Sequence, residues 1–243
     1  MTVELVGIGV GPGDPDLLTV GAVRELNSAG RVFVPVMSPE VAGRAETVAR
    51  AHLTHDRLER LVFALNDEVA GSQARRQDCW NTAAAQVAAY LGERSGSAAF
   101  ATLGDPTVYS TFSYLAGTVR ELLPGVRIRT VPGITAMQAA ASAAGLTLVE
   151  GAEPLTLLPL SRDLAELDTA LARGGAVVAY KGGRRLAQLQ ERVAAAGALD
   201  RAWCAEHLGT ADERITPLAL AGSASYLSTV LVLPLRRGRG AQL

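Results

Sequence analysis

Residues 5–15 read Leu-Val-Gly-Ile-Gly-Val-Gly-Pro-Gly-Asp-Pro, and this stretch decides the architecture at the start of the chain. Its first five residues have the composition of a short buried strand, and a glycine-rich turn follows. The next segment, 16–29, carries apolar residues at helical spacing. A strand, a tight turn and a helix in this order predict an α/β fold.

The glycine spacing of this stretch does not match the dinucleotide-binding fingerprint G-x-G-x-x-G. Counting from Gly7, the third glycine position is Pro12, and counting from Gly9 it is Asp14. Proline also removes an amide that would otherwise point at a phosphate. We therefore expect either a ligand loop without a pyrophosphate cradle or a plain turn between a strand and a helix.

The strand-and-helix alternation continues along the whole chain. Helical patterns also occupy 77–91, 134–144 and 184–196. Ten segments are predicted to be strands: 5–9, 31–35, 61–64, 98–102, 126–131, 155–160, 176–180, 202–206, 215–220 and 229–235. The polar stretch 149–154 separates five strands from five. We therefore predict two α/β domains, 1–148 and 149–243, although the helix at 134–144 fits either one.

The composition excludes several functional classes. With 243 residues, 49% hydrophobic and 19% charged, the chain can bury a sizeable core. The formal net charge of -1 gives no basic field for nucleic acid, and no apolar run is long enough to span a bilayer. Two distant cysteines, Cys79 and Cys204, argue against a disulfide framework and for the reducing cytosol. Because Lys181 is the only lysine and follows tyrosine, a Walker A loop is excluded.

Three further loops follow predicted strands. Residues 102–111 place Gly104 and Asp105 at a strand end, where a carboxylate can accept hydrogen bonds from a ribose or an amine. Alternatively, the segment is a plain Asp-Pro turn with Asp105 near the N-terminus of the following helix. Residues 131–137 combine a Pro-Gly turn with a helix start. Residues 179–185 contain three basic side chains next to two glycines. This combination indicates either an anion-binding site or a solvated helix start.

Neither a metal site nor a nucleophilic triad is expected. His52 and His55 are three residues apart with Asp56 beside them, but a metal needs more ligands in a defined geometry. The chain also lacks the G-x-S-x-G elbow of the α/β-hydrolases.

The ordered set of motifs is far more specific than any one of them. GVGPGDPDLLT, GDPTVYSTFSYL, VPGITA, YKGGR and EHLGTADERI resemble the tetrapyrrole methylases, which use S-adenosylmethionine to methylate corrin precursors. The resemblance covers roughly residues 3–233. Within the family, the continuation after GDP is most similar to the branch that methylates C(20) of precorrin-2 to give precorrin-3A.

The resemblance implies two α/β domains that form a trough, S-adenosylmethionine bound between them, and a cytosolic homodimer. It also implies a set of cofactor-lining residues. Carried over residue by residue, these are Pro12, Leu103, Gly104, Asp105, Val108, Thr135, Ala136, Lys181 and Leu208. Lys181 stands where methionine is common elsewhere in the family, so it could face a carboxylate of the cofactor or of the substrate. No catalytic residue is implied.

The substrate carries many carboxylates, so arginines should line its site. Arg44, Arg184 and Arg185 are candidates because they follow predicted strand ends. Four alternatives stay open: cobalt-factor II as the substrate, another tetrapyrrole carbon, a protein or RNA acceptor, and a tetrapyrrole carrier without activity. A nucleotide-binding dehydrogenase is disfavoured by the glycine spacing.

Overall fold

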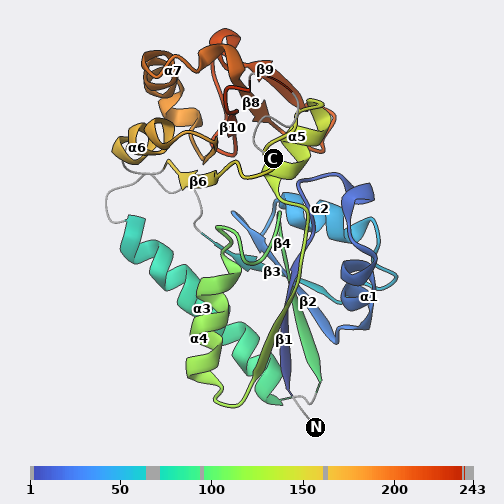
Figure 1. Cartoon of the computed structure of the whole chain (residues 1–243). Helices are drawn as coiled ribbons and strands as arrows, with labels where there is room; N and C mark the ends of the chain where they lie inside the picture. Colours follow the sequence, from blue (N-terminus) through green and yellow to red (C-terminus); the bar gives the residue numbers. More distant parts are fainter. Residues whose placement is uncertain (1–2, 64–71, 94–95, 161–163, 237, 239–243) are drawn as a thin grey trace. The chain divides into compact units, whose positions relative to one another are not determined.

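The chain folds into two compact units, Met1–Thr135 and Ala136–Leu243. This computed structural model describes residues 3–63, 72–93, 96–160, 164–236 and 238 (Figure 1). The predicted division after residue 148 differs in assigning 136–148 to the first domain, and it stays a prediction. The predicted fold class, two α/β domains of five strands each, is confirmed.

The first unit is a parallel five-stranded sheet with helices on both faces. Its strand order is β3-β2-β4-β1-β5. The elements in chain order are β1 (Glu4–Gly9), η1 (Pro15–Leu17), α1 (Val20–Ser28), β2 (Arg31–Val36), α2 (Arg44–Arg50), β3 (Leu58–Val62), α3 (Ser72–Glu93), β4 (Ser97–Thr102), α4 (Phe112–Leu122) and β5 (Arg127–Val131).

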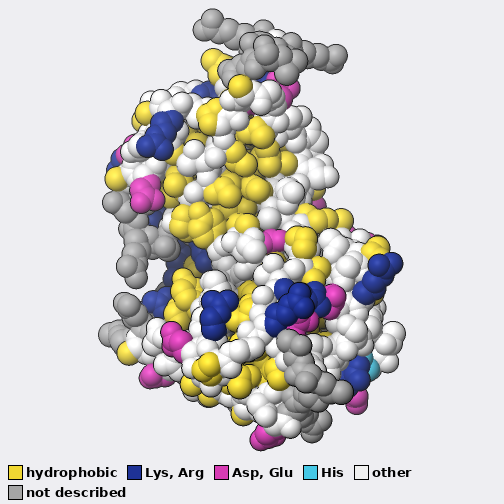
Figure 2. All heavy atoms as spheres, turned by 60° about the horizontal axis from the view of Figure 1, so that its bottom comes forward, with side chains coloured by type: hydrophobic (Ala, Val, Ile, Leu, Met, Phe, Trp, Pro, Cys, Tyr) yellow, Lys and Arg dark blue, Asp and Glu magenta, His cyan; other side chains and the backbone are white. Residues whose placement is uncertain are grey.

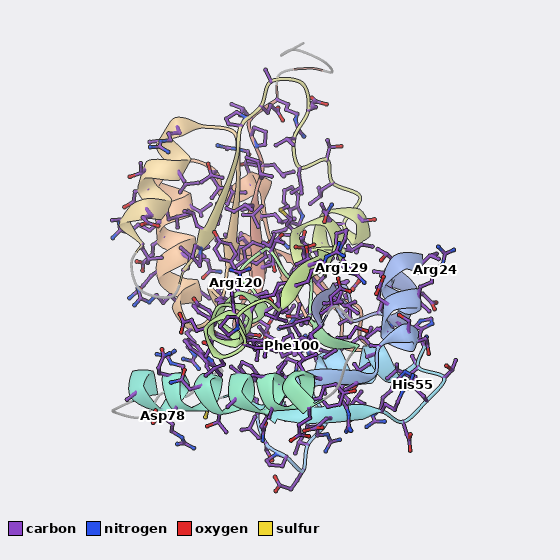
Figure 3. All side chains as sticks on the ribbon, turned by 90° about the horizontal axis from the view of Figure 1, so that it is seen from below. Arg24, His55, Asp78, Phe100, Arg120 and Arg129 are labelled. Carbon is purple, nitrogen blue, oxygen red and sulfur yellow. The ribbon has the colours of Figure 1, made fainter. Side chains whose placement is uncertain are left out.

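The two faces of this sheet are covered by different helices. Alternate residues of the strands pack with α1 and α2 on one face and with α3 and α4 on the other (Figure 1). Phe100 of β4, labelled in Figure 3, lies wholly buried on the second face. Its ring contacts the rings of Phe63 and Phe112. The connections after the neighbouring strands β1 and β4 therefore leave the sheet on opposite faces, and such a point opens a crevice at the carboxyl ends of the strands.

The second unit has a mixed sheet in the order β6-β7-β10-β8-β9, in which only β6 and β7 are parallel. Helices α6 and α7 cover one face, and α5 packs against β10. The elements are α5 (Ala136–Ala143), β6 (Leu155–Pro159), α6 (Ala165–Arg173), β7 (Ala176–Tyr180), η2 (Gly183–Arg185), α7 (Leu186–Ala195), η3 (Leu199–Arg201), β8 (Ala202–Glu206), β9 (Arg214–Pro217), η4 (Leu218–Leu220) and β10 (Thr229–Val232).

Several predicted segments differ from the structure. The predicted helix 16–29 divides into η1 and α1, and the predicted strand 215–220 ends at Pro217, where η4 begins. Residue 64, the end of one predicted strand, lies outside the described residues. None of the described helices is both long and apolar enough to cross a membrane.

Charged side chains pair rather than accumulate by sign. On the face shown in Figure 2, basic and acidic side chains lie next to one another. In the first unit, Arg129 contacts both Glu4 and Glu25, and the buried Glu46 binds Arg50 and Arg60. Pairing of this kind is consistent with the near-zero net charge.

Candidate functional site

The glycine-rich loop after β1 is joined by backbone hydrogen bonds to the loop after β4. Gly104 N–H donates to Gly11 O at 2.7 Å, and Gly11 N–H donates to Gly104 O at 3.3 Å. Val10 N–H adds a bond of 2.9 Å to Thr102 O. Gly11 and Gly104 have φ values of 77° and 70°, so glycine is favoured at both positions. The two loops quoted from the sequence are therefore parts of one structure at the crevice.

The loop after β5 packs against this pair of loops with no side chain between them. A Cβ at Gly9 would lie 2.6 Å from both Gly104 O and Gly133 N. A Cβ at Gly133 would lie 2.8 Å from Gly9 Cα and closer still to Gly104 O. Because all the nearest atoms belong to backbone, neither position has room for a larger residue. Three segments distant in sequence thus meet where β1 lies between β4 and β5.

Asp105 ties the same loops together through its carboxylate. Its Oδ1 accepts from Thr107 N–H at 2.7 Å and from Thr107 Oγ1 at 2.5 Å, and its Oδ2 accepts from Gly133 N–H at 2.9 Å. Burial by itself would raise the pKa of Asp105, but the bonds from Thr107 and Gly133 outweigh it and lower that pKa. A carboxylate offers about four acceptor positions, so Oδ2 can still accept one more hydrogen bond.

The other candidates of the first unit lie around these loops. Pro12 and Thr135 are buried, and Leu103 and Val108 are half-buried. The loop after β4 is closed by a hydrogen bond of 2.9 Å between the hydroxyls of Thr102 and Ser110. Leu103, Gly104 and Asp105 therefore belong to a fixed turn.

Arg44 lies at the same edge of the sheet but further along it. It is the first residue of α2, which follows β2, and β4 separates β2 from β1. The structure thus brings the cofactor candidates 12, 103–105 and 135 to the crevice strands and places Arg44 beside them at the next strand.

In the second unit, the candidates gather where β7 and β8 end on either side of β10. Lys181 follows β7 directly, and Leu208, which is buried, follows β8 after one residue. Lys181 N–H donates to Ser228 O at 3.1 Å, just before β10 begins. Ala136 starts α5, which packs against β10.

The two arginine candidates of this unit lie in η2. The guanidinium of Arg184 stacks over the Tyr226 ring at 5.0 Å, a cation–π contact with the loop before β10. Arg185 is half-buried. Both lie in a short 3-10 turn ahead of α7.

Backbone strain marks three strand-end loops. Among the described non-glycine residues, positive φ occurs at Tyr109, Lys181 and His207, with values of 49°, 62° and 52°. They follow β4, β7 and β8. Such conformations are costly and concentrate at ligand sites. Sequence inspection missed Tyr109 and His207 because no residue pattern reports a left-handed conformation at a non-glycine position.

The sequence analysis also missed Ser225 and Ser228. Both hydroxyls are buried; that of Ser228 has no hydrogen-bond partner among the described residues, whereas that of Ser225 bonds to Glu206 and helps to lower the pKa of that carboxyl. The serine-rich run at 223–228 was the available signal, since three serines precede a buried strand. For metals, the described residues include no group of three His, Cys, Asp or Glu side chains able to hold an ion.

The sequence is similar to a known protein family and to several of its members. The family model described as Tetrapyrrole (Corrin/Porphyrin) Methylases matches residues 4–222. A precorrin-2 C(20)-methyltransferase of Sinorhizobium sp is 34% identical over 236 residues, covering 94% of each chain. A Methanocaldococcus jannaschii protein named "Probable cobalt-precorrin-2 C(20)-methyltransferase" is also 34% identical, over 69% of this chain and 70% of its own.

A solved structure supports the fold. A cobalamin synthesis related protein from Corynebacterium diphtheriae superposes with a TM-score of 0.71 at 18% identity. The match covers 97% of this chain and 100% of the other. At this identity the likeness concerns the fold alone.

Proposed function

The chain belongs to the tetrapyrrole (corrin/porphyrin) methylase family, and from this premise we propose that it transfers a methyl group from S-adenosylmethionine to C(20) of precorrin-2, giving precorrin-3A in cobalamin biosynthesis. The observation that carries the proposal is the 34% identity to a precorrin-2 C(20)-methyltransferase over 94% of both chains. We propose that the crevice formed by the loops after β1, β4 and β5 contributes to the site of this activity.

The residues at the crevice suit the methyl donor. S-adenosylmethionine supplies an electrophilic methyl group on a sulfonium, and it carries hydroxyl and ammonium donors. Asp105 has one unused acceptor position for such a donor. Gly104 leaves open space, because a Cβ there would have no atom within 4 Å. We therefore assign cofactor binding to Pro12, Leu103, Gly104, Asp105, Val108 and Thr135 of the first unit, and to Ala136, Lys181 and Leu208 of the second.

Methyl transfer needs no protein nucleophile. An electron-rich ring carbon attacks the methyl group directly, the methyl–sulfur bond breaks with release of S-adenosylhomocysteine, and the ring carbon then loses its proton. Holding two reactants in line can account for about 7–11 kcal/mol of a barrier at best. The task of the chain is then to bind and orient. Arg44, Arg184 and Arg185 are proposed to bind substrate carboxylates, since arginine matches the geometry of that group.

We also propose that the protein is a homodimer and that it works in the cytosol. Exposed apolar side chains on the first unit include Val20, Met37 and Val41. A contiguous apolar patch is typical of a protein contact, so the proposal expects a partner subunit to cover part of this apolar surface. Light scattering on the eluting peak of a sizing column would test the dimer, and a monomer mass would refute it.

The proposed activity is tested by anaerobic incubation with S-adenosylmethionine and either precorrin-2 or cobalt-factor II. Mass spectrometry should show one added methyl group, and carbon NMR should place it at C(20). The faster substrate decides between the metal-free and metallated rings. A methyl group at another carbon would assign the chain to a different branch of the family. No methylation of either ring would refute the proposal.

A further inference from the structure

The loop after β4 holds a tyrosine in a backbone conformation that suits glycine. Tyr109 has a φ of 49°, in the left-handed region, which is an unusual conformation for a bulky side chain. The same loop has glycine at its other left-handed position, Gly104, where φ is 70°. Glycine would adopt the conformation at 109 without strain. The tyrosine therefore costs free energy that a glycine would not cost.

Burial of the ring does not account for this cost. Tyr109 is 45% exposed, whereas Phe112, three residues later, is 3% exposed. Within the segment 103–111, Thr107 and Tyr109 are exposed and the other residues are buried or half-buried. Strained residues persist where they serve a site, and an exposed ring is available to a ligand that binds from outside.

The backbone just before Tyr109 belongs to the crevice. Val108 N–H donates to Asp105 O at 3.3 Å. The carboxylate of Asp105 in turn accepts from Gly133 N–H, in the loop after β5, at 2.9 Å. Tyr109 thus follows directly on the turn that joins the loops at the carboxyl ends of β4 and β5.

The backbone just after Tyr109 is anchored to the sheet. The hydroxyl of Ser110 bonds to that of Thr102, the last residue of β4, at 2.9 Å, and it accepts from Phe112 N–H at 3.1 Å. The Phe112 ring lies against Gly7 of β1, where a Cβ would come within 2.6 Å of Phe112 Cδ1. A side chain between two fixed segments is already ordered, so a ligand that contacts it loses less entropy on binding.

Two flat groups occur among the reactants of the proposed reaction, the adenine of the methyl donor and the tetrapyrrole macrocycle. The residues of this loop that we assign to the methyl donor, 103–105 and 108, are buried or half-buried. Tyr109 is exposed, and the larger reactant has to approach from the exposed side. The macrocycle is therefore the better match for this ring.

We propose that the ring of Tyr109 contacts the macrocycle of the tetrapyrrole and positions it for methyl transfer. The proposal rests on the proposed function and deepens it, because it assigns a substrate contact to an aromatic side chain rather than to a charged one. Contacts between aromatic rings contribute beyond the apolar area that they bury, and they favour defined relative orientations. A reaction that depends on alignment benefits from such a contact.

Binding to two probes tests the contact. Sirohydrochlorin, a stable tetrapyrrole polycarboxylate, represents the acceptor, and S-adenosylhomocysteine represents the methyl donor. Tyr109→Phe keeps the ring and should bind both within about twofold of the unaltered protein. Tyr109→Asn loses the ring but keeps a residue that tolerates the left-handed backbone. Its Kd for sirohydrochlorin should rise about fivefold to tenfold, and its Kd for S-adenosylhomocysteine should stay within about twofold.

Thermal unfolding separates a substrate contact from a structural role. Tyr109→Gly removes the strain together with the ring, so its Tm should not fall, while its Kd for sirohydrochlorin should rise as in Tyr109→Asn. The matched control is Tyr114→Ala in α4, which removes another exposed tyrosine ring, stacked on Trp80 at 4.5 Å. This control should bind both probes as the unaltered protein does.

An unchanged Kd for sirohydrochlorin in Tyr109→Asn would overturn the inference, even in a protein that methylates precorrin-2. A parallel loss of S-adenosylhomocysteine affinity, or a lower Tm in Tyr109→Gly, would overturn it as well, since the ring would then serve the methyl donor or the fold. The proposed function fails separately. A protein that binds sirohydrochlorin through Tyr109 but methylates neither ring would support the contact and remove the C(20) transfer. An unaltered protein that binds no tetrapyrrole would overturn both.

Discussion

Gly133→Ala is expected to damage both stability and cofactor binding, because the added methyl group meets only backbone. The new Cβ would lie 2.8 Å from Gly9 Cα and closer to Gly104 O. Favourable carbon contacts begin near 3.5 Å, so the loops must separate by about 0.7 Å or more. No side-chain rotation can relieve this overlap.

The magnitude follows from two losses. Overpacking a tight site costs about 1–3 kcal/mol. The displacement also strains the bond of 2.9 Å from Gly133 N–H to Asp105, and a hydrogen bond to a charged group contributes about 1.5–3 kcal/mol. Taking part of each gives a loss of about 3 kcal/mol in the free energy of unfolding. For a chain of this length, that lowers the Tm by roughly 6–12 °C.

The matched control is Gly117→Ala in the interior of α4. A Cβ at Gly117 would have no atom within 4 Å, and alanine is favoured over glycine in a helix by about 1 kcal/mol. This variant should be slightly more stable than the unaltered protein and should bind S-adenosylhomocysteine normally.

Calorimetric unfolding and titration with S-adenosylhomocysteine measure both effects. Gly133→Ala should combine the lower Tm with an affinity reduced tenfold or more. A Tm within about 2 °C of the unaltered protein and an unchanged Kd would refute the reasoning. Gly9→Ala, whose Cβ would lie 2.6 Å from Gly104 O, repeats the test from another strand should the first variant not fold.

Three further predictions concern charges. Arg60→Leu removes one of two partners of the fully buried Glu46 and should lower the free energy of unfolding in urea, whereas Arg192→Leu, at an exposed pair, should lower it less. Asp105→Asn should cost about 2 kcal/mol in the same assay and weaken S-adenosylhomocysteine binding, while unchanged values would remove Asp105 from the site. Hydrogen bonds and ion pairs lower the pKa values of Asp105 and Glu46, so each contributes stability above its ordinary pKa near 4 and loses it as the pH falls through its lower folded value. The free energy of unfolding should therefore fall below about pH 4.5, with a shallower slope in Asp105→Asn.

Sequence patterns were sufficient where strands are buried on both faces. The predicted strands 176–180 and 202–206 coincide with β7 and β8, because continuous apolar runs signal such strands directly. The edge strand β3 was placed too late, since its polar residues Glu59 and Arg60 are spent on ion pairs that a hydrophobicity pattern does not mark. Pro217 ended a strand that the pattern continued, because proline cannot donate to the ladder.

The functional loops could be found individually, but their meeting could not. That Gly9, Gly104 and Gly133 touch depends on β1 lying between β4 and β5, an order that no local signal encodes. The buried hydroxyl of Ser228, which has no partner among the described residues, depends equally on the antiparallel pairing of β10 with β7 and β8. Residue type identified donors and acceptors, and topology decided which of them remain unused.

The rigid loops of the crevice suit the proposed methyl transfer, which depends on alignment of the two reactants. Three of the four acceptor positions of Asp105 bind the chain itself, and the glycine contacts allow no play between the loops. Both features hold the loops rigidly in place, and they leave Asp105 only one acceptor position for a ligand. Since a misplacement of about 1 Å can cost about a hundredfold in rate, a reaction that depends on alignment is protected by such rigidity. The turnover of Gly133→Ala at saturating donor and acceptor should therefore fall, although the replaced atom takes no part in the chemistry.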